Sequence, residues 1–172
     1  NRKNITIVDG YNVINAWSNL LEISKSSLEA ARDKLIDEMA EYKSLSGEEV
    51  IIVFDAYNLD RPKETIIEKY GIKIVYTKRF QTADTYIEKQ ILDLSHKHNL
   101  KIVTDDGQIQ ILATSKGASR ITSNELRSDI YNNQKKINRT RKKDFNRNFK
   151  SFPLSKEMID KIDQIKEDLD KD

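Results

Sequence analysis

The sequence contains no cysteine, only two histidines, no long hydrophobic run and little net charge. Without cysteine, a disulfide framework and a cysteine-based zinc site are both excluded. No apolar stretch approaches the ~20 residues that a membrane-spanning helix needs, and no basic segment followed by an apolar one indicates a signal peptide. We therefore expect a cytoplasmic protein without a membrane partner. A chain of 172 residues is expected to form one domain with a substantial core.

The net charge of +2 hides an uneven distribution along the chain. Residues 134–150 hold eight lysines or arginines and one aspartate, a local charge of +7, whereas residues 155–172 carry a local charge of −3. A basic stretch with interleaved phenylalanines suits contact with RNA phosphates and bases, although a solvated helix face is the simpler interpretation. We call these basic residues the basic block; they are Lys135, Lys136, Arg139, Arg141, Lys142, Lys143, Arg147 and Lys150.

Short apolar runs alternate with helical patterns along the chain. The runs are almost continuously apolar, which is typical of strands covered on both faces. The predicted strands are 4–8, 49–54, 72–76 and 100–104, with a shorter fifth strand at 119–122. Because helical segments separate the strands, we expect parallel pairing with right-handed crossovers. The sequence therefore predicts an α/β fold with a central parallel sheet of about five strands, flanked by helices.

Capping patterns predict where several helices begin and end. Ser26 and Glu29 match a capping box, and Gly47 is placed to end that helix. Pro62 is placed to begin a second helix, which would run to about Tyr70. A third helix is predicted from the apolar stripe of residues 82–98.

The C-terminal part is predicted to consist of helices that separate near Pro153. We expect the first domain to cover residues 1–150, which includes the basic segment 134–150. Residues 151–172 are expected to form an amphipathic helix that is capped by Ser155 and packs on that domain.

Acidic residues stand at the ends of the predicted strands. Asp9 follows the first strand, Asp55 the second, and Asp105 and Asp106 the fourth, while Asp84 opens the helix after the third. The carboxyl ends of parallel strands meet at one edge, where open α/β sheets bind ligands. Converging carboxylates raise one another's pKa and need a cation, and a set of oxygen ligands favours Mg²⁺ or Mn²⁺. Two such ions ~4 Å apart are a common device for phosphodiester cleavage.

Each of these acids also has a simpler interpretation as a turn or capping residue. Asp9 and Gly10 suit a hairpin turn, and Thr85 with Glu88 matches a capping box, so Glu88 can be purely structural. The long helical connections weaken the hairpin interpretation, and we expect Gly10 to let the backbone turn without a Cβ. Trp17 suits the core better than a stacking platform for RNA.

Taken in order, five segments resemble a known family: "VDGYNVINAW", "VFDAYN", "TADTYIEK", "VTDDGQIQ" and "KGASRITSNEL". They are similar to the YacP-like branch of the NYN-domain nucleases, which are relatives of the PIN domain, over about residues 4–150. The resemblance implies a PIN-like fold and a metal-dependent endoribonuclease. Some members of this branch act on messenger RNA in association with the ribosome, so RNA and the ribosome are implied partners, and no small-molecule cofactor is expected.

Carried over by position, the resemblance also implies roles for individual residues. Asp9, Asp84 and Asp106 match the acidic metal site, and Asn12 matches the polar residue beside it, where it can bond a water or a phosphate oxygen. Two further acids are implied near the metal: Asp55, on the second strand, and Glu88, one helical turn after Asp84. The family usually has serine before its last aspartate, where this chain has Asp105. Which of Asp105 and Asp106 faces the metal is therefore open, and the register set by Thr104 favours Asp106.

The sequence thus predicts an endoribonuclease that hydrolyses RNA phosphodiester bonds, with messenger RNA on the ribosome as its expected substrate. The alternative is a non-catalytic RNA- or ribosome-binding module with the same fold, but none of the four acidic positions is lost. A phosphotransfer enzyme of the haloacid type needs a second aspartate two residues after the first, where this chain has Tyr11. Receiver domains need paired acids after the first strand, where only Asp9 is present.

Overall fold

The computed structural model describes residues 1–56, 63–149 and 155–171, and these form an α/β protein. Six strands make one sheet in the order β3-β4-β2-β1-β5-β6, and all neighbours are parallel except β3 and β4. The strands are β1 (Asn4–Asp9), β2 (Glu49–Phe54), β3 (Thr65–Lys69), β4 (Ile72–Tyr76), β5 (Asn99–Val103) and β6 (Ser119–Ile121). The helices are α1 (Gly10–Ala16), α2 (Ser18–Ser26), α3 (Leu28–Ser46), α4 (Ala83–Leu94), α5 (Gly107–Ser115), α6 (Ser123–Phe149) and α7 (Lys156–Asp170).

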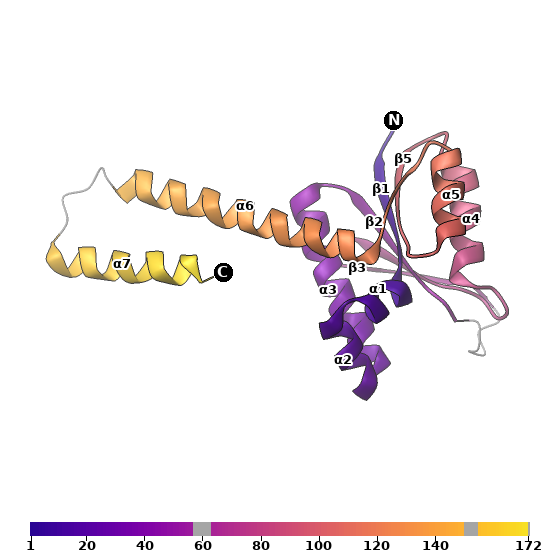
Figure 1. The fold of residues 1–172 in the computed structure, drawn as a ribbon, viewed down its shortest axis with the longest axis horizontal. Helices are drawn as coiled ribbons and strands as arrows, with labels where there is room; N and C mark the ends of the chain where they lie inside the picture. The colour runs from indigo at the N-terminus through magenta and orange to yellow at the C-terminus, as the bar shows by residue number, and fades with distance from the viewer. Residues whose placement is uncertain (57–62, 150–154, 172) are drawn as a thin grey trace. The chain divides into compact units, whose positions relative to one another are not determined.

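Helices cover both faces of the sheet, as its apolar strands require. Figure 1 shows α4 and α5 on one side of the strands and α1, α2 and α3 on the other. On the α4 side, buried Ile7 and Ile102 share a core cluster with Ile87 and Ile91 of α4 and with Ala113 of α5. The parallel fold predicted from the sequence is therefore confirmed.

The register of the sheet brings the ends of three strands together. Asp9 pairs with Val53 across β1 and β2, and Val8 pairs with Val103 across β1 and β5. The segments that follow these strands therefore leave the sheet at the same edge. We call this edge, at the carboxyl ends of β1, β2 and β5, the acid edge.

The predicted second helix, from Pro62 to about Tyr70, is wrong. Pro62 lies outside the described residues, and Thr65–Lys69 is the edge strand β3, paired antiparallel with β4. The turn between them has a positive φ at both Tyr70 (54°) and Gly71 (77°), the combination that a tight hairpin of the type I′ class requires. A glycine after an apolar segment serves a hairpin as well as a helix end, and the sheet consequently has six strands instead of about five.

Two predicted capping boxes are also wrong, because each helix is capped by a different residue from the predicted one. Helix α3 is capped by Ser27, whose hydroxyl accepts the N–H of Ala30 at 3.1 Å, and not by Ser26. Helix α4 is capped by Thr82, which accepts the N–H of Thr85 at 3.1 Å, so Glu88 does not take part in a capping box. The left-handed residue Gly47 does end α3, as predicted.

The described residues divide into two compact units, 1–127 and 128–172. The second unit contains most of α6, which begins well before the predicted basic segment, and the helix α7. Ser155 caps α7 by accepting the N–H of Met158 at 3.3 Å, as predicted, whereas the packing of α7 on the first domain stays a prediction. Among the described residues, no helix combines the length and apolarity needed to cross a membrane.

Gly10 follows Asp9 for a reason that the sequence did not reveal. It is the first residue of α1 and is not among the glycines with a positive φ, so the turn itself does not require it. A Cβ at this position would lie 2.4 Å from an edge carbon of the buried Phe54 ring. Gly10 is therefore needed because α1 crosses β2 at a distance that leaves no space for a methyl group.

Candidate active site at the acid edge

Asp9 is the most deeply buried acid of the edge, with 5% of its surface exposed. It ends β1 and caps α1, where its Oδ1 accepts the N–H of Asn12 at 3.3 Å. Burial is the main cause that raises the pKa of Asp9 to about 7; the charges of Asp84, Asp55 and Asp105 act in the same direction, and the hydrogen bond from Asn12 opposes them. The carboxylate of Asp9 is therefore held in an environment that disfavours its charge.

Asp84 lies in the first turn of α4 and faces the same group of acids. Burial raises its pKa, followed by the charge of Asp106 and a hydrogen bond with that carboxyl, and then by the charges of Glu88 and Asp55. Glu88 is exposed one turn further along α4. Asp9 is thus within electrostatic reach of Asp84, Asp55 and Asp105, and Asp84 is within reach of Asp106, Glu88 and Asp55.

The two successive acids after β5 have different environments. Both carboxylate oxygens of Asp105 bind Ser123, one accepting its N–H and the other its hydroxyl, each at 2.9 Å. Asp106 instead caps α5, where its Oδ1 accepts the N–H groups of Gln108 (2.8 Å) and Ile109 (3.3 Å), while the same carboxyl interacts with Asp84. These contacts support Asp106 as the acid that faces the site and Asp105 as the acid that anchors the start of α6.

Neutral groups connect the strand ends between the acids. The side-chain oxygen of Asn12 accepts the backbone N–H of Asp105 at 2.8 Å, which joins the segment after β1 to the segment after β5. The hydroxyl of buried Thr104 accepts the N–H of Asp106 at 3.1 Å and lies 3.5 Å from the same Asn12 oxygen. The oxygen of Asn12 thus links the segments that follow two strands, and its expected bond to a water or a phosphate oxygen stays a prediction.

The donor chemistry of the acid edge fits a hard divalent cation. Its described side chains offer carboxylate oxygens, which Mg²⁺ and Mn²⁺ prefer, and the raised pKa of both Asp9 and Asp84 is the condition that a cation would relieve. In the described parts of the chain, however, no three Asp, Glu or His side chains stand at the spacing of a formed metal cage. The metal-ligand roles of these residues therefore stay predictions.

An arginine and three aromatic residues lie close together beside the acid edge, and the sequence analysis did not predict this cluster. The guanidinium of Arg32, on α3, donates to the hydroxyl of Tyr11 at 3.2 Å. The Tyr11 ring lies 5.2 Å from the Phe54 ring, which in turn stacks on Tyr76 at 5.6 Å. The sequence held no local signal for this cluster, because Arg32 and Tyr11 are 21 positions apart.

Trp17 belongs to the core, as predicted. It is 2% exposed, donates its indole N–H to the carbonyl of Ser123 at 2.8 Å, and lies under the guanidinium of Arg127 at 4.7 Å. Arg127 is also paired with Glu38 at 3.2 Å. Trp17 therefore positions the start of α6 and offers no free ring to a nucleic acid.

The basic block lies on α6 within the second unit, except for Lys150, which is outside the described residues. Lys142 forms an ion pair with Asp170 of α7, and Arg147 forms one with Asp144. A cavity of about 250 Å³ lies between α6 and α7; its lining residues are Lys135, Asn138, Arg139, Lys142, Leu169 and Asp170. One predicted basic face of α6 is thus directed toward α7, and its binding role stays a prediction.

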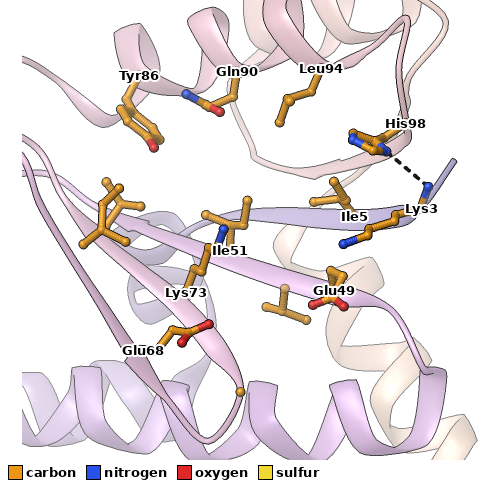
Figure 2. A pocket seen from close by; sticks show the side chains of 14 residues that line it. Lys3, Ile5, Glu49, Ile51, Glu68, Lys73, Tyr86, Gln90, Leu94 and His98 are labelled. Carbon is orange, nitrogen blue, oxygen red and sulfur yellow. Dashed lines mark hydrogen bonds between the residues drawn. The ribbon is translucent and has the colours of Figure 1, made fainter. Parts of the chain in front are cut away.

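A second cleft, of about 540 Å³, lies at the amino-terminal ends of the strands (Figure 2). Figure 2 shows Tyr86, Gln90 and Leu94 of α4 above the strands, and the N–H of Lys3 donates to Nδ1 of His98 at 3.2 Å. None of the predicted site residues lines this cleft. Because ligands of open parallel sheets bind at the carboxyl ends of the strands, the acid edge is the better candidate.

The chain belongs to the YacP-like NYN domain family, whose model matches residues 6–167. YacP of Bacillus subtilis (strain 168), described as an uncharacterized protein, is 37% identical over 136 residues, which cover 78% of this chain and 79% of that protein. A crystal structure of a mutant of Rae1 (YacP) from Bacillus subtilis matches with a TM-score of 0.68 at 32% identity, over 97% of this chain and 98% of that chain. The structure of Rae1 (YacP) itself gives a TM-score of 0.66 at 34% identity, over 84% and 83%. The resemblance predicted from the sequence is confirmed.

Proposed function

We propose that the chain is a divalent-metal-dependent endoribonuclease whose active site is the acid edge. The observation that carries the proposal is the gathering of partly buried carboxylates there: burial first, and then the charges of the neighbouring acids, raise the pKa of Asp9 to about 7 and raise that of Asp84. Such crowding destabilises a metal-free protein and is typical of functional sites. The membership of the YacP-like NYN domain family, with its nuclease-like fold, supports the same conclusion.

Asp9, Asp84 and Asp106 would hold the cation, with Asp55 and Glu88 at its border. A bound Mg²⁺ or Mn²⁺ supplies an activated water and stabilises the oxygen that leaves the phosphorus. The chain itself contributes the spacing of the carboxylates, which the Asn12 contact to the backbone of Asp105 maintains. Hydrolysis in this manner leaves a 5′-phosphate on the downstream RNA fragment.

Messenger RNA in association with the ribosome is the substrate that we propose, on the strength of the family resemblance. The test is to incubate the purified protein with free and with ribosome-bound messenger RNA, in Mg²⁺ or Mn²⁺, and to map the cleaved ends. Asp93→Asn is the matched control, because Asp93 is an exposed acid on the same helix as Asp84. Cleavage by the Asp93→Asn control but not by Asp9→Asn or Asp84→Asn is the expected result.

The non-catalytic alternative predicts a different outcome of the same experiment. A binding module would associate with RNA or ribosomes in either metal and produce no new RNA ends above the background. Near-normal cleavage by both Asp9→Asn and Asp84→Asn would show instead that the chemistry lies elsewhere than at the acid edge.

The basic block is proposed to bind RNA phosphates without taking part in the chemistry. Its two faces on α6 provide a matched comparison: Lys136, Lys143 and Arg147 on one face, and Lys135, Arg139 and Lys142, the face that lines the cavity with α7, on the other. Three glutamines on the first face should flatten the salt dependence of RNA binding by about 2 in log–log slope, at 0.7 per lost contact. Three glutamines on the second face should have a smaller effect on the slope. Equal slopes for the parent and both triple variants would exclude the basic block as a phosphate-binding surface.

A further inference from the structure

Arg32 is a half-buried cation whose partners, in the described part of the chain, are phenols. Its guanidinium donates to the Tyr11 hydroxyl at 3.2 Å, and Tyr76 is the other side chain that acts on it. No ion pair joins Arg32 to a carboxylate among the described residues. Arg127 shows the contrasting arrangement, since it is paired with Glu38 and covers a ring. A guanidinium held by neutral hydroxyl groups keeps its full charge and its remaining N–H donors for an anion.

The topology places this arginine at the acid edge. Tyr11 lies two residues after Asp9, at the start of α1. Tyr76 is the last residue of β4 and pairs with Phe54, the residue that precedes Asp55. The phenols that act on Arg32 thus belong to segments adjoining two of the acids.

Among the described residues, no ion pair joins Arg32 to Asp9 or to Asp84. The strongest influences on the pKa of Asp9 and of Asp84 are burial and the neighbouring carboxyls, together with one backbone hydrogen bond at Asp9, and Arg32 is not among them. Its charge therefore stays available to an anion that approaches the edge from solvent. A guanidinium offers a planar fork of five N–H donors, which suits the non-bridging oxygens of a phosphate.

We propose that Arg32, held by Tyr11, binds one phosphate of the RNA strand beside the acid edge. This inference rests on the proposed endoribonuclease function and adds the residue that offsets the repulsion between the RNA backbone and the carboxylates. Arg32 is a binding residue in this proposal, and Tyr11 is a positioning residue that acts through it.

The test is a double-mutant cycle between the arginine and individual phosphates of the RNA. The full chain carrying Asp9→Asn, which prevents cleavage, is titrated in Mg²⁺ with short single-stranded RNAs that each contain one uncharged methylphosphonate linkage. At one linkage, neutralisation should weaken binding about tenfold when Arg32 is present, the size of a charge-assisted hydrogen bond, and less than about twofold after Arg32→Gln. Such position-specific non-additivity cannot arise from a merely structural role.

Three further variants sharpen the measurement. Arg32→Lys keeps the charge without the fork and should retain a coupling of about threefold at the same linkage. Tyr11→Phe removes the hydroxyl that holds the guanidinium and should reduce the coupling while leaving the charge in place. Lys34→Gln removes an exposed positive charge from the same helix and should be additive at every linkage.

Additivity at every linkage for Arg32→Gln and Arg32→Lys, in proteins with an unchanged circular dichroism spectrum, would overturn the inference. That outcome is separable from failure of the proposed function, because binding is measured in a protein that does not cleave. If Arg32 and one RNA linkage are coupled in binding but the parent cuts no RNA in Mg²⁺ or Mn²⁺, the phosphate contact is supported and the proposed nuclease activity is excluded. If the parent cuts RNA but no linkage is coupled to Arg32, the nuclease activity is supported and the Arg32–phosphate contact is excluded.

Discussion

Two polar clusters lie along the same strands of the sheet, and their charges are balanced in opposite ways. Away from the acid edge, Lys101 of β5 donates to Tyr42 at 2.5 Å and to Glu48 at 3.2 Å. Glu48 also accepts hydrogen bonds from Tyr42 at 2.5 Å and from Thr6 of β1 at 2.7 Å. Each charge and hydroxyl of this cluster thus has a partner within it, whereas the acid edge collects like charges.

The pKa directions of the two clusters express this difference. Burial alone would raise the pKa of Glu48, but the hydrogen bonds from Tyr42 and Thr6 and the charge of Lys101 outweigh burial, so the pKa is lowered. At Asp9, burial and neighbouring acids together raise the pKa to about 7. A cluster that satisfies its own charges stabilises the fold, whereas the described residues around Asp9 leave its charge unbalanced, as is common at functional sites.

The largest expected effect comes from removing a charge at the unbalanced cluster. Asp9→Asn should lower RNA cleavage by about a thousandfold or more, since a missing metal ligand removes charge stabilisation worth several kcal/mol in the transition state. The same variant should unfold at a higher temperature than the parent when both are free of metal. Rate measurements in Mg²⁺ and thermal unfolding in EDTA provide the two readings; a less stable variant would contradict the unbalanced-charge interpretation.

The pH dependence of that stability difference provides the second prediction. Asp9 has a pKa of about 7 in the folded chain against 3.8 for an ordinary aspartate, so the unfolded chain releases its proton first as the pH rises. Without metal, the parent should therefore lose stability relative to Asp9→Asn between pH 4 and 7, by at most about 4 kcal/mol, and the difference should be constant above that range. Denaturant titrations at several pH values in EDTA test this; a difference that does not change with pH would contradict it.

The balanced cluster should respond in the reverse manner. Lys101→Met leaves Glu48 half-buried without its cation and should cost about 2 kcal/mol of unfolding free energy, the usual loss for a hydrogen bond to a charged group. RNA cleavage at saturating substrate should stay within about twofold of the parent. A variant that is as stable as the parent but cleaves slowly would contradict the interpretation that this cluster serves stability and the acid edge serves activity.

Glu88 should give the smallest effect, because it is exposed and acts mainly through its charge on Asp84. Glu88→Gln should lower the pKa of Asp84 and raise the Mg²⁺ concentration needed for half-maximal cleavage by about tenfold, as removal of a group at the border of a metal site does. Stability should change little, since Glu88 has no capping role in α4. An unchanged metal titration would show that Glu88 is an ordinary surface residue.

The sequence predicted the parts of the fold that depend on local patterns. Buried parallel strands appear as continuous apolar runs, so five of the six strands and the acids at their ends could be predicted. The strand β3 could not, because a five-residue edge strand followed by Gly71 has the same signals as a short helix with its terminal glycine. Helices α1, α2 and α5 were also missed, since their apolar residues are too few to establish a helical period.

The gathering of acids at the ends of the strands could be predicted, but the contacts that arrange them could not. Asp105 and Asp106 are adjacent in sequence, and only the long-range contact to Ser123 separates an anchoring acid from one that faces Asp84. The role of Gly10 depends on the position of Phe54, which is 44 residues away (54 − 10). Arg32 likewise depends on Tyr11, and no local pattern links residues 21 positions apart.

The contact between the Asn12 side chain and the backbone of Asp105 has a consequence for the choice of ion. It is an uncharged bond between two strand ends, so the width that it sets does not change when a neighbouring carboxylate gains or loses a proton. A frame of constant width distinguishes cations by their radius as well as by their charge. Mg²⁺ takes oxygen ligands at about 2.1 Å and Ca²⁺ at about 2.4 Å, so we expect the metal site proposed at this edge to prefer the smaller ion.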